Sequence, residues 1–156
     1  MPSPFKRLAL LLVTCLTLLA QVPLRWTYAG GYTVAGTSAK LTLQLPTSST
    51  RKIHPLTYSV VCGGACTVTL IRNGTTATAT AGTVVKNRTA NPTAHAQLFT
   101  ASDSTGGTSF PAYPISGGGQ TFDLSDMEII PGENVTISVT SSVSQNISPS
   151  IKWEEY

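Results

Sequence analysis

The chain changes character abruptly near residue 29, and this break most constrains how it can fold. Residues 8–24 carry no charged side chain between Arg7 and Arg25. After the break, the chain is rich in Thr, Ser and Gly and consists of short runs that end at turn residues. The apolar part needs an environment other than water or is removed from the chain, whereas the polar part can fold in water. The two parts therefore have different physical roles. We therefore divide the chain into an apolar leader (1–29), a linker (30–38) and a folded domain (39–156).

Apolar and polar residues alternate with a period of two in the folded part, which predicts β-strands. In residues 134–140, Val135, Ile137 and Val139 face one side and hydroxyl side chains face the other. This pattern is typical of an antiparallel strand with one buried face. The expected strands are residues 40–45, 56–62, 66–72, 75–80, 83–86, 94–100, 121–124, 134–140 and 148–155.

Turn residues separate the expected strands and favour a simple all-β topology. Asn73-Gly74 between two strand-like runs predicts a β-hairpin. Residues 101–119 form the longest irregular stretch and are expected to be a surface loop. No useful helix-period segment lies outside the leader. The predicted fold is all-β, an antiparallel β-sandwich of the jelly-roll or Ig-like type, preceded by an N-terminal apolar helix or signal segment.

The leader has two interpretations, and both stay open. A basic start, an apolar run and small residues before Ala29 are typical of a secretory signal peptide cut after that residue. Alternatively, the leader is retained as an anchor. Its uncharged run is shorter than the roughly 20 residues needed to span a bilayer. A retained leader would therefore lie in a protein assembly or dip into a membrane.

The charges argue against nucleic acid as a partner. The formal net charge is +3, and three basic residues, Lys6, Arg7 and Arg25, lie in or beside the leader. The rest of the chain carries seven basic and seven acidic residues, without a basic stripe. We therefore expect no direct nucleic-acid binding. A neutral, hydroxyl-rich surface suits proteins that pack against copies of themselves or other subunits, or that sit outside cells.

No catalytic, cofactor-binding or metal-binding residues are predicted. The two histidines, His54 and His95, stand apart in the sequence, and no nucleophile motif accompanies them. A zinc site needs more ligands at suitable spacing. We therefore expect that the protein is not an enzyme and uses no cofactor.

Two pairs of residues are candidate sites of another kind. Cys62 and Cys66 flank Gly63-Gly64-Ala65, and a disulfide between them is within reach if those three residues form a hairpin loop. The alternative is two small apolar residues in a reduced protein. Phe110 and Tyr113 lie beside prolines in the expected 101–119 loop, which makes them a candidate interaction loop.

Four asparagines lie in N-x-[ST] sequences, the acceptor pattern for N-glycosylation. They are Asn73, Asn87, Asn134 and Asn146. Turn chemistry and the high Ser and Thr content explain most of these matches, and glycosylation stays open.

Three segments carry a resemblance to a known class of proteins. They are residues 82–91 (GTVVKNRTAN), residues 129–139 (IIPGENVTISV) and the Trp-Glu-Glu-Tyr end at 153–156. Over about residues 56–156, the chain resembles small β-sandwich structural proteins of tailed-phage virions. The resemblance implies a non-enzymatic, oligomeric virion component, such as a capsid decoration, head fibre or tail-associated protein. Its partners would be copies of itself and other virion subunits. The leader departs from this pattern.

A second hypothesis comes from another class of proteins. An exported prokaryotic cell-surface protein, such as an adhesin, a filament subunit or a carbohydrate-binding module, would also combine a leader with a hydroxyl-rich β-domain. The first hypothesis places the chain in a virion, and the second places it on the cell surface or in the medium. A mature chain that starts near Gly30 would favour export.

Overall fold

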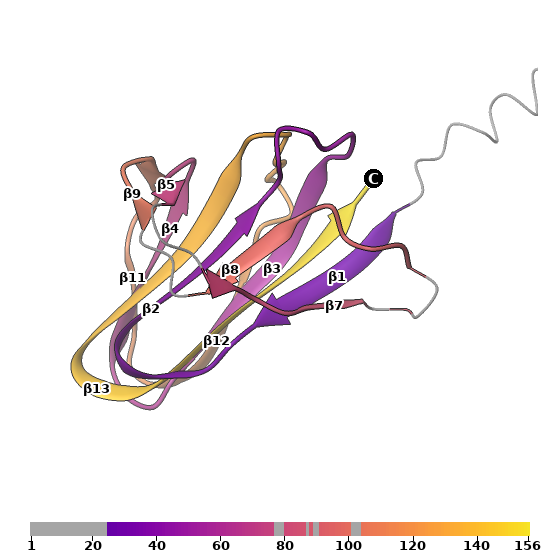
Figure 1. Cartoon of the computed structure of the whole chain (residues 1–156). Helices are drawn as coiled ribbons and strands as arrows, with labels where there is room; N and C mark the ends of the chain where they lie inside the picture. Colours follow the sequence, from indigo (N-terminus) through magenta and orange to yellow (C-terminus); the bar gives the residue numbers. More distant parts are fainter. Residues whose placement is uncertain (1–24, 77–79, 87, 89–90, 101–103) are drawn as a thin grey trace, which may run out of the picture.

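The computed structural model describes residues 25–156 except 77–79, 87, 89–90 and 101–103, and the regular structure in these residues is β-strand (Figure 1). Within them, no helix has the length and hydropathy that a membrane span requires. The strands are β1 (Trp26–Gly31), β2 (Val34–Gln44), β3 (Ile53–Cys62), β4 (Cys66–Arg72), β5 (Thr75–Thr76), β6 (Thr80–Ala81), β7 (Val84–Lys86), β8 (Gln97–Thr100), β9 (Ser104–Thr105), β10 (Thr108–Ser109), β11 (Tyr113–Ile115), β12 (Gly118–Asp123) and β13 (Asn134–Glu155).

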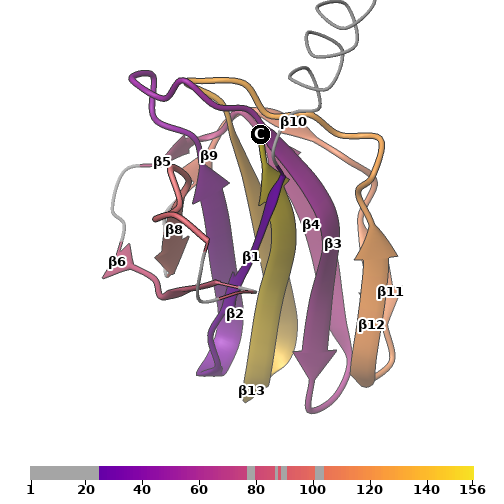
Figure 2. The same ribbon diagram turned by 90° about the vertical axis from the view of Figure 1, so that its right-hand side faces the viewer.

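Eleven of these strands form one antiparallel sheet, and the 22-residue strand β13 is its centre. The first half of β13 pairs with β2 and β4, and its second half pairs with β3 and β1. Because one long, bent strand serves both groups of partners, the sheet curls into a half-barrel (Figures 1 and 2). β5 and β9 pair separately as a two-stranded sheet.

The curl brings distant strands into contact across the core. A Cβ atom at Gly30 in β1 would overlap Leu98 in β8 and lie 2.8 Å from the carbonyl oxygen of Thr83. Only glycine therefore fits at position 30, where β1 approaches the Leu98 side chain of β8 closely. The largest fully buried apolar side chains are Tyr28, Leu41, Leu43, Leu45, Ile53, Val60, Val68, Ile129, Ile137, Ile147 and Trp153.

The prediction of an all-β, antiparallel fold is confirmed. The eleven-stranded sheet curls into a half-barrel beside the small sheet of β5 and β9, and the sandwich arrangement stays a prediction. The jelly-roll or Ig-like type stays a prediction. The expected helix or signal segment lies outside the described residues.

The expected boundary between leader, linker and domain differs from the structure. Residues 26–31 form β1, and residues 34–38 are the start of β2. Tyr28 is 0% exposed, stacks on Trp153 at 5.9 Å between ring centroids, and donates a hydrogen bond to the Pro92 carbonyl oxygen at 3.0 Å. A cut after Ala29 would divide β1 and remove this core side chain. The strand was missed because it is short and ends in two glycines.

The expected strands are largely present, with informative differences. The expected strand 66–72 matches β4, whereas 134–140 and 148–155 are parts of the single strand β13. The expected 101–119 loop contains β9, β10, β11 and the start of β12.

The hairpin predicted at Asn73-Gly74 is wrong. Asn73 does adopt a left-handed turn conformation, with φ of 55°. The strands on either side do not pair with each other, because β4 pairs with β10, β11 and β13 while β5 pairs with β9. The turn therefore directs the chain away from β4 and does not reverse it along the same strand.

Candidate functional site

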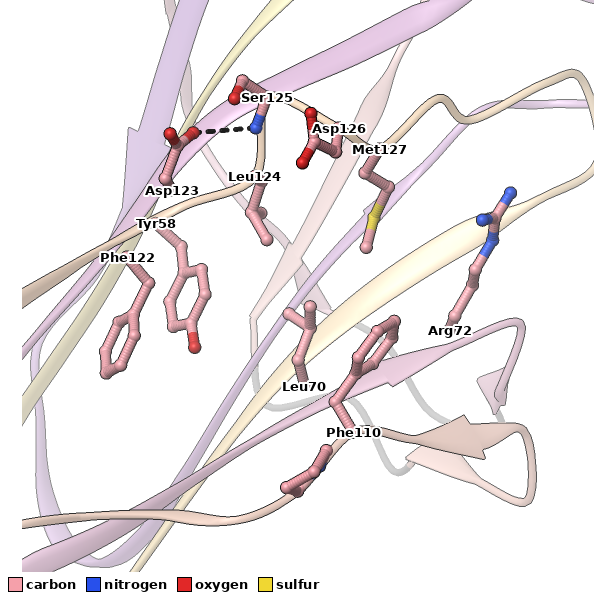
Figure 3. A pocket seen from close by; sticks show the side chains of 11 residues that line it. Tyr58, Leu70, Arg72, Phe110, Phe122, Asp123, Leu124, Ser125, Asp126 and Met127 are labelled. Atoms are coloured by element: carbon pink, nitrogen blue, oxygen red, sulfur yellow. Dashed lines mark hydrogen bonds between the residues drawn. The ribbon is translucent and has the colours of Figure 1, made fainter.

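An open groove of about 440 Å³ lies between β12 with the segment after it and β4 with the segment after β10 (Figure 3). Apolar side chains make up most of its wall: Leu70, Phe110, Pro111, Phe122, Leu124 and Met127. Polar side chains line the remainder: Tyr58, Arg72, Asp123, Ser125 and Asp126. Its volume lies within the range of small-ligand sites, which combine apolar walls with a few placed polar groups.

Aromatic side chains from three strands form one cluster at this groove. Tyr58 and Phe122 are register partners in β3 and β12, and their rings stack at 4.5 Å between centroids. Cross-strand partners share one face of a sheet, so this pairing follows from the register. Tyr113 in β11 packs edge-on against Phe122 at 5.1 Å.

Of the two residues of the candidate interaction loop, Phe110 lines the groove and Tyr113 belongs to the aromatic cluster beside it. Phe110 lines the groove and is 43% exposed, and Tyr113 is 49% exposed. The Phe110 N–H donates to the Leu70 carbonyl oxygen at 2.9 Å, which anchors the segment after β10 to β4. That these two residues contact a partner stays a prediction.

The polar groups of the groove differ in how they are held. The Asp123 carboxylate accepts a hydrogen bond from the Ser125 N–H at 2.8 Å, and hydrogen bonds from Ser125 lower the pKa of Asp123. Asp126 is exposed and has no hydrogen bond or ion pair to another described residue. Burial raises the pKa of Tyr58 to about 12, so its hydroxyl stays protonated at neutral pH.

Arg72, on the opposite wall, belongs to a structural network. Its Nη2 atom donates to the Glu128 carbonyl oxygen and to Glu133 Oε2, both at 2.9 Å. Burial raises the pKa of the Glu133 carboxyl. Hydrogen bonds from Asn73, the Ile130 N–H and Arg72 outweigh that effect, so the pKa lies below its usual value.

The outer edge of β12 is a second feature of this side of the molecule (Figure 2). β12 pairs with β3 and with no other described strand. The Leu124 N–H donates to the Leu56 carbonyl oxygen at 2.9 Å. Because hydrogen-bonded and non-hydrogen-bonded pairs alternate along an antiparallel ladder, the backbone N–H and C=O groups of Gly119 and Thr121 point away from β3.

The two cysteines form a disulfide in the structure, with their Cα atoms 6.5 Å apart. Cys62 ends β3 and Cys66 begins β4, and these strands do not pair with each other. Both strands pair with β13, β4 along its first half and β3 along its second half, so the disulfide links two strands that follow one another along one edge of β13. It is not the cross-strand bond of a hairpin.

The remaining sequence candidates are dispersed. His54 contacts the Ser125 carbonyl oxygen, and His95 Nδ1 lies 3.2 Å from Ser49 Oγ. In the part of the chain that the structure describes, no three His, Cys, Asp or Glu side chains form a group that could hold a metal.

The four N-x-[ST] asparagines lie in different environments. Asn134 is buried and donates to the Gly74 carbonyl oxygen at 2.8 Å, and Asn73 donates to Glu133 Oε1 at 3.1 Å. Asn146 is exposed on β13, and Asn87 lies outside the described residues. Asn134 therefore has no room for a glycan in the folded chain.

The sequence analysis missed a buried carboxylate at the end of β13. Glu155 is 0% exposed and pairs with Arg51 at 3.2 Å. The Arg51 guanidinium also lies over the Trp26 ring, 4.3 Å from its centroid. The signal was in the sequence, because Glu155 continues the inward alternation of Ile151 and Trp153.

Comparisons with known proteins find no family. No protein-family model matches the chain, and no curated protein matches it in sequence. Among solved structures, a mitogen from Yersinia pseudotuberculosis matches with a TM-score of 0.30 and 13% identity, over 83% of this chain and 86% of that one. A structure of broad bean stain virus matches with a TM-score of 0.27 and 11% identity, over 83% of each chain.

A third match is the VP2 subviral particle of infectious bursal disease virus, with a TM-score of 0.17 and 9% identity, over 86% of this chain and 41% of that one. These are weak structural matches to β-rich viral proteins and a mitogen. Similarity at this level supports no conclusion about the chain's family or function.

Proposed function

We propose that the chain is a non-enzymatic structural protein, a subunit that decorates or joins a phage-like particle by adding a neighbour's strand to the outer edge of β12. Its partners are copies of itself and other subunits of the particle. The chain then functions as part of the virion.

The observation that carries this proposal is that the unpaired outer edge of β12 is exposed and uncharged. From Gly118 to Thr121 the strand is exposed on both faces and carries no charge, and Asp123 closes it at the far end. Soluble proteins normally protect such edges with charged residues, proline or bulges, because unpaired backbone groups are a template for strand addition. The outward backbone groups of Gly119 and Thr121 supply the hydrogen bonds that an added strand needs.

Two further features support an assembly role. The folded part has balanced charges and a surface rich in hydroxyl side chains, so charge repulsion between copies is weak. The segments at 82–91, 129–139 and 153–156 resemble those of tailed-phage structural proteins.

The solution mass of the full chain and of two variants at one position tests the edge. Thr121→Pro removes one outward N–H and leaves the inward ladder to β3 in place. Thr121→Ala is the matched control, because both variants lose the Thr121 hydrogen bond to Ser59, which spans 2.7 Å in the structure. We expect oligomers for the native chain and for Thr121→Ala, and a monomer for Thr121→Pro, by light scattering after size exclusion. A native chain that stays monomeric at all concentrations would contradict the proposal.

Mass spectrometry of purified phage-like particles from a producing culture tests whether the chain is part of the particle. We expect the chain in fixed stoichiometry with the other subunits. Recovery from the culture medium or the cell surface alone, with no chain in the particles, would favour the exported cell-surface protein.

A further inference from the structure

The groove beside β12 contains a buried hydroxyl without a partner. Tyr58 is 7% exposed, and its hydroxyl makes no hydrogen bond to another described residue. In Figure 3 the hydroxyl points toward the space between Phe122 and Leu70. The hydroxyl oxygen keeps some accessible surface, and Tyr58 lines the groove, so a ligand in the groove can reach it. A ligand that hydrogen-bonds this largely enclosed hydroxyl replaces its limited contact with water by a fixed partner, and we expect the exchange to add affinity.

The surroundings of this hydroxyl narrow the chemistry of such a ligand. The half-exposed ring of Phe110 and the side chains of Leu70 and Met127 offer an apolar surface. At the other side, the Asp126 carboxylate is exposed and without a partner among the described residues, and an ionised carboxylate only accepts hydrogen bonds. The ligand therefore needs one apolar face, hydroxyl donors toward the carboxylate, and a group that pairs with the Tyr58 hydroxyl.

We propose that this groove is a binding site for a saccharide of one or two rings. A sugar ring presents C–H groups on one face and hydroxyls around its rim, which matches the apolar wall and the polar groups. The volume of about 440 Å³ suits a small ligand of this kind. This site is independent of strand addition at the outer edge of β12, where backbone groups make the contacts.

Nuclear magnetic resonance titration of the full chain tests the site. The probes are cellobiose, maltose, lactose and diacetylchitobiose, each raised to about 20 mM, which saturates a millimolar site. We expect at least one of the four sugars to shift the backbone signals of the groove segments 109–111 and 122–127. The absence of shifts with all four sugars would overturn the proposal.

Variants separate binding from folding. Tyr58→Phe keeps the stacked ring and removes only the hydroxyl, so we expect about tenfold weaker sugar binding with unchanged or higher thermal stability. Phe110→Ala removes part of the exposed apolar wall and should also weaken binding. The control is Val85→Ala, since Val85 is also an exposed apolar residue but lies on β7 and does not line the groove.

Two results would contradict the proposal even if a sugar binds. One is sugar binding by Tyr58→Phe with native affinity. The other is that a short basic peptide displaces the bound sugar and shifts the same groove signals at a much lower concentration, which would make the groove a peptide site directed by Asp123 and Asp126. The oligomer mass of these variants is measured in parallel. Loss of sugar binding with the native mass separates this site from the edge of β12.

Discussion

The buried carboxylate of Glu155 offers the sharpest test of how the fold is held together. Its Oε1 accepts hydrogen bonds from the Ala96 N–H at 2.9 Å and the Trp153 Nε1–H at 3.3 Å. Its Oε2 accepts from the His95 N–H at 2.9 Å and from Arg51 Nη1 at 3.2 Å. The carboxylate thereby joins the end of β13 to the segment before β8 and to the segment before β3.

Substitution of Glu155 by Gln should destabilise the protein strongly, although the two side chains have the same shape. Both carboxylate oxygens face donors only, so either orientation of the amide turns an NH₂ group toward two N–H donors. Each buried donor that loses its acceptor costs about 1–3 kcal/mol. Loss of the charge that pairs with Arg51 adds to this, as expected when one partner of a buried ion pair is removed. We expect a loss of about 3–5 kcal/mol, which lowers the melting temperature by about 10–20 °C.

The assay is urea unfolding followed by tryptophan fluorescence, with the unfolding midpoint compared between variants. Glu154→Gln is the matched control, because the neighbouring Glu154 makes only an exposed ion pair with Arg25 at 3.3 Å. We expect that variant to lie within about 1 kcal/mol of the native protein. The account of this network is refuted if Glu155→Gln is as stable as Glu154→Gln.

Three further predictions follow from the structure. A chain that starts at Arg25 should fold, whereas one that starts at Gly30 should lose cooperative unfolding in circular dichroism because it lacks most of β1; equal stability of the two would contradict the role of that strand. The pKa of Glu133 is lower in the folded state than in the unfolded state. The charged Glu133 carboxylate therefore stabilises the fold at pH values above its unfolded pKa, and this stabilisation is lost as the pH falls through its folded pKa. Glu133→Gln should therefore be less stable than the native protein at pH 7, with a difference that shrinks on acidification in urea titrations; a constant difference would show that the charge is not the cause. Replacing both Cys62 and Cys66 by Ser should cost no more than about 2 kcal/mol, because the closed loop is very short, and failure to fold would show that the bond does more than close it.

The alternation of apolar and polar residues predicted strands well where each strand has one buried face. The residues of β4 are the example, with Cys66, Val68 and Leu70 buried as the pattern indicates. The pattern could not reveal β1, because a short run that ends in two glycines carries little periodicity. It also could not show that β13 continues through residues 141–147, where serines occupy a bend between two sets of partners.

The candidate site was predictable only in part. Phe110 and Tyr113 stood out as aromatic residues in a segment rich in turn residues. Tyr58 and Phe122 join them through the register of β3 and β12, which depends on pairing between segments far apart in the sequence. The inward position of Glu155 followed the alternation, but a charged residue is rarely expected in a core.

Hydrogen exchange at the edge of β12 tests the proposed assembly most directly. The Gln120 and Phe122 N–H groups point toward β3 and serve as internal references, whereas those of Gly119 and Thr121 point outward. In the assembled full chain, we predict that the Gly119 and Thr121 amides are protected as strongly as the two references. Free exchange at Gly119 and Thr121 in the assembly, beside protected references, would contradict strand addition at this edge.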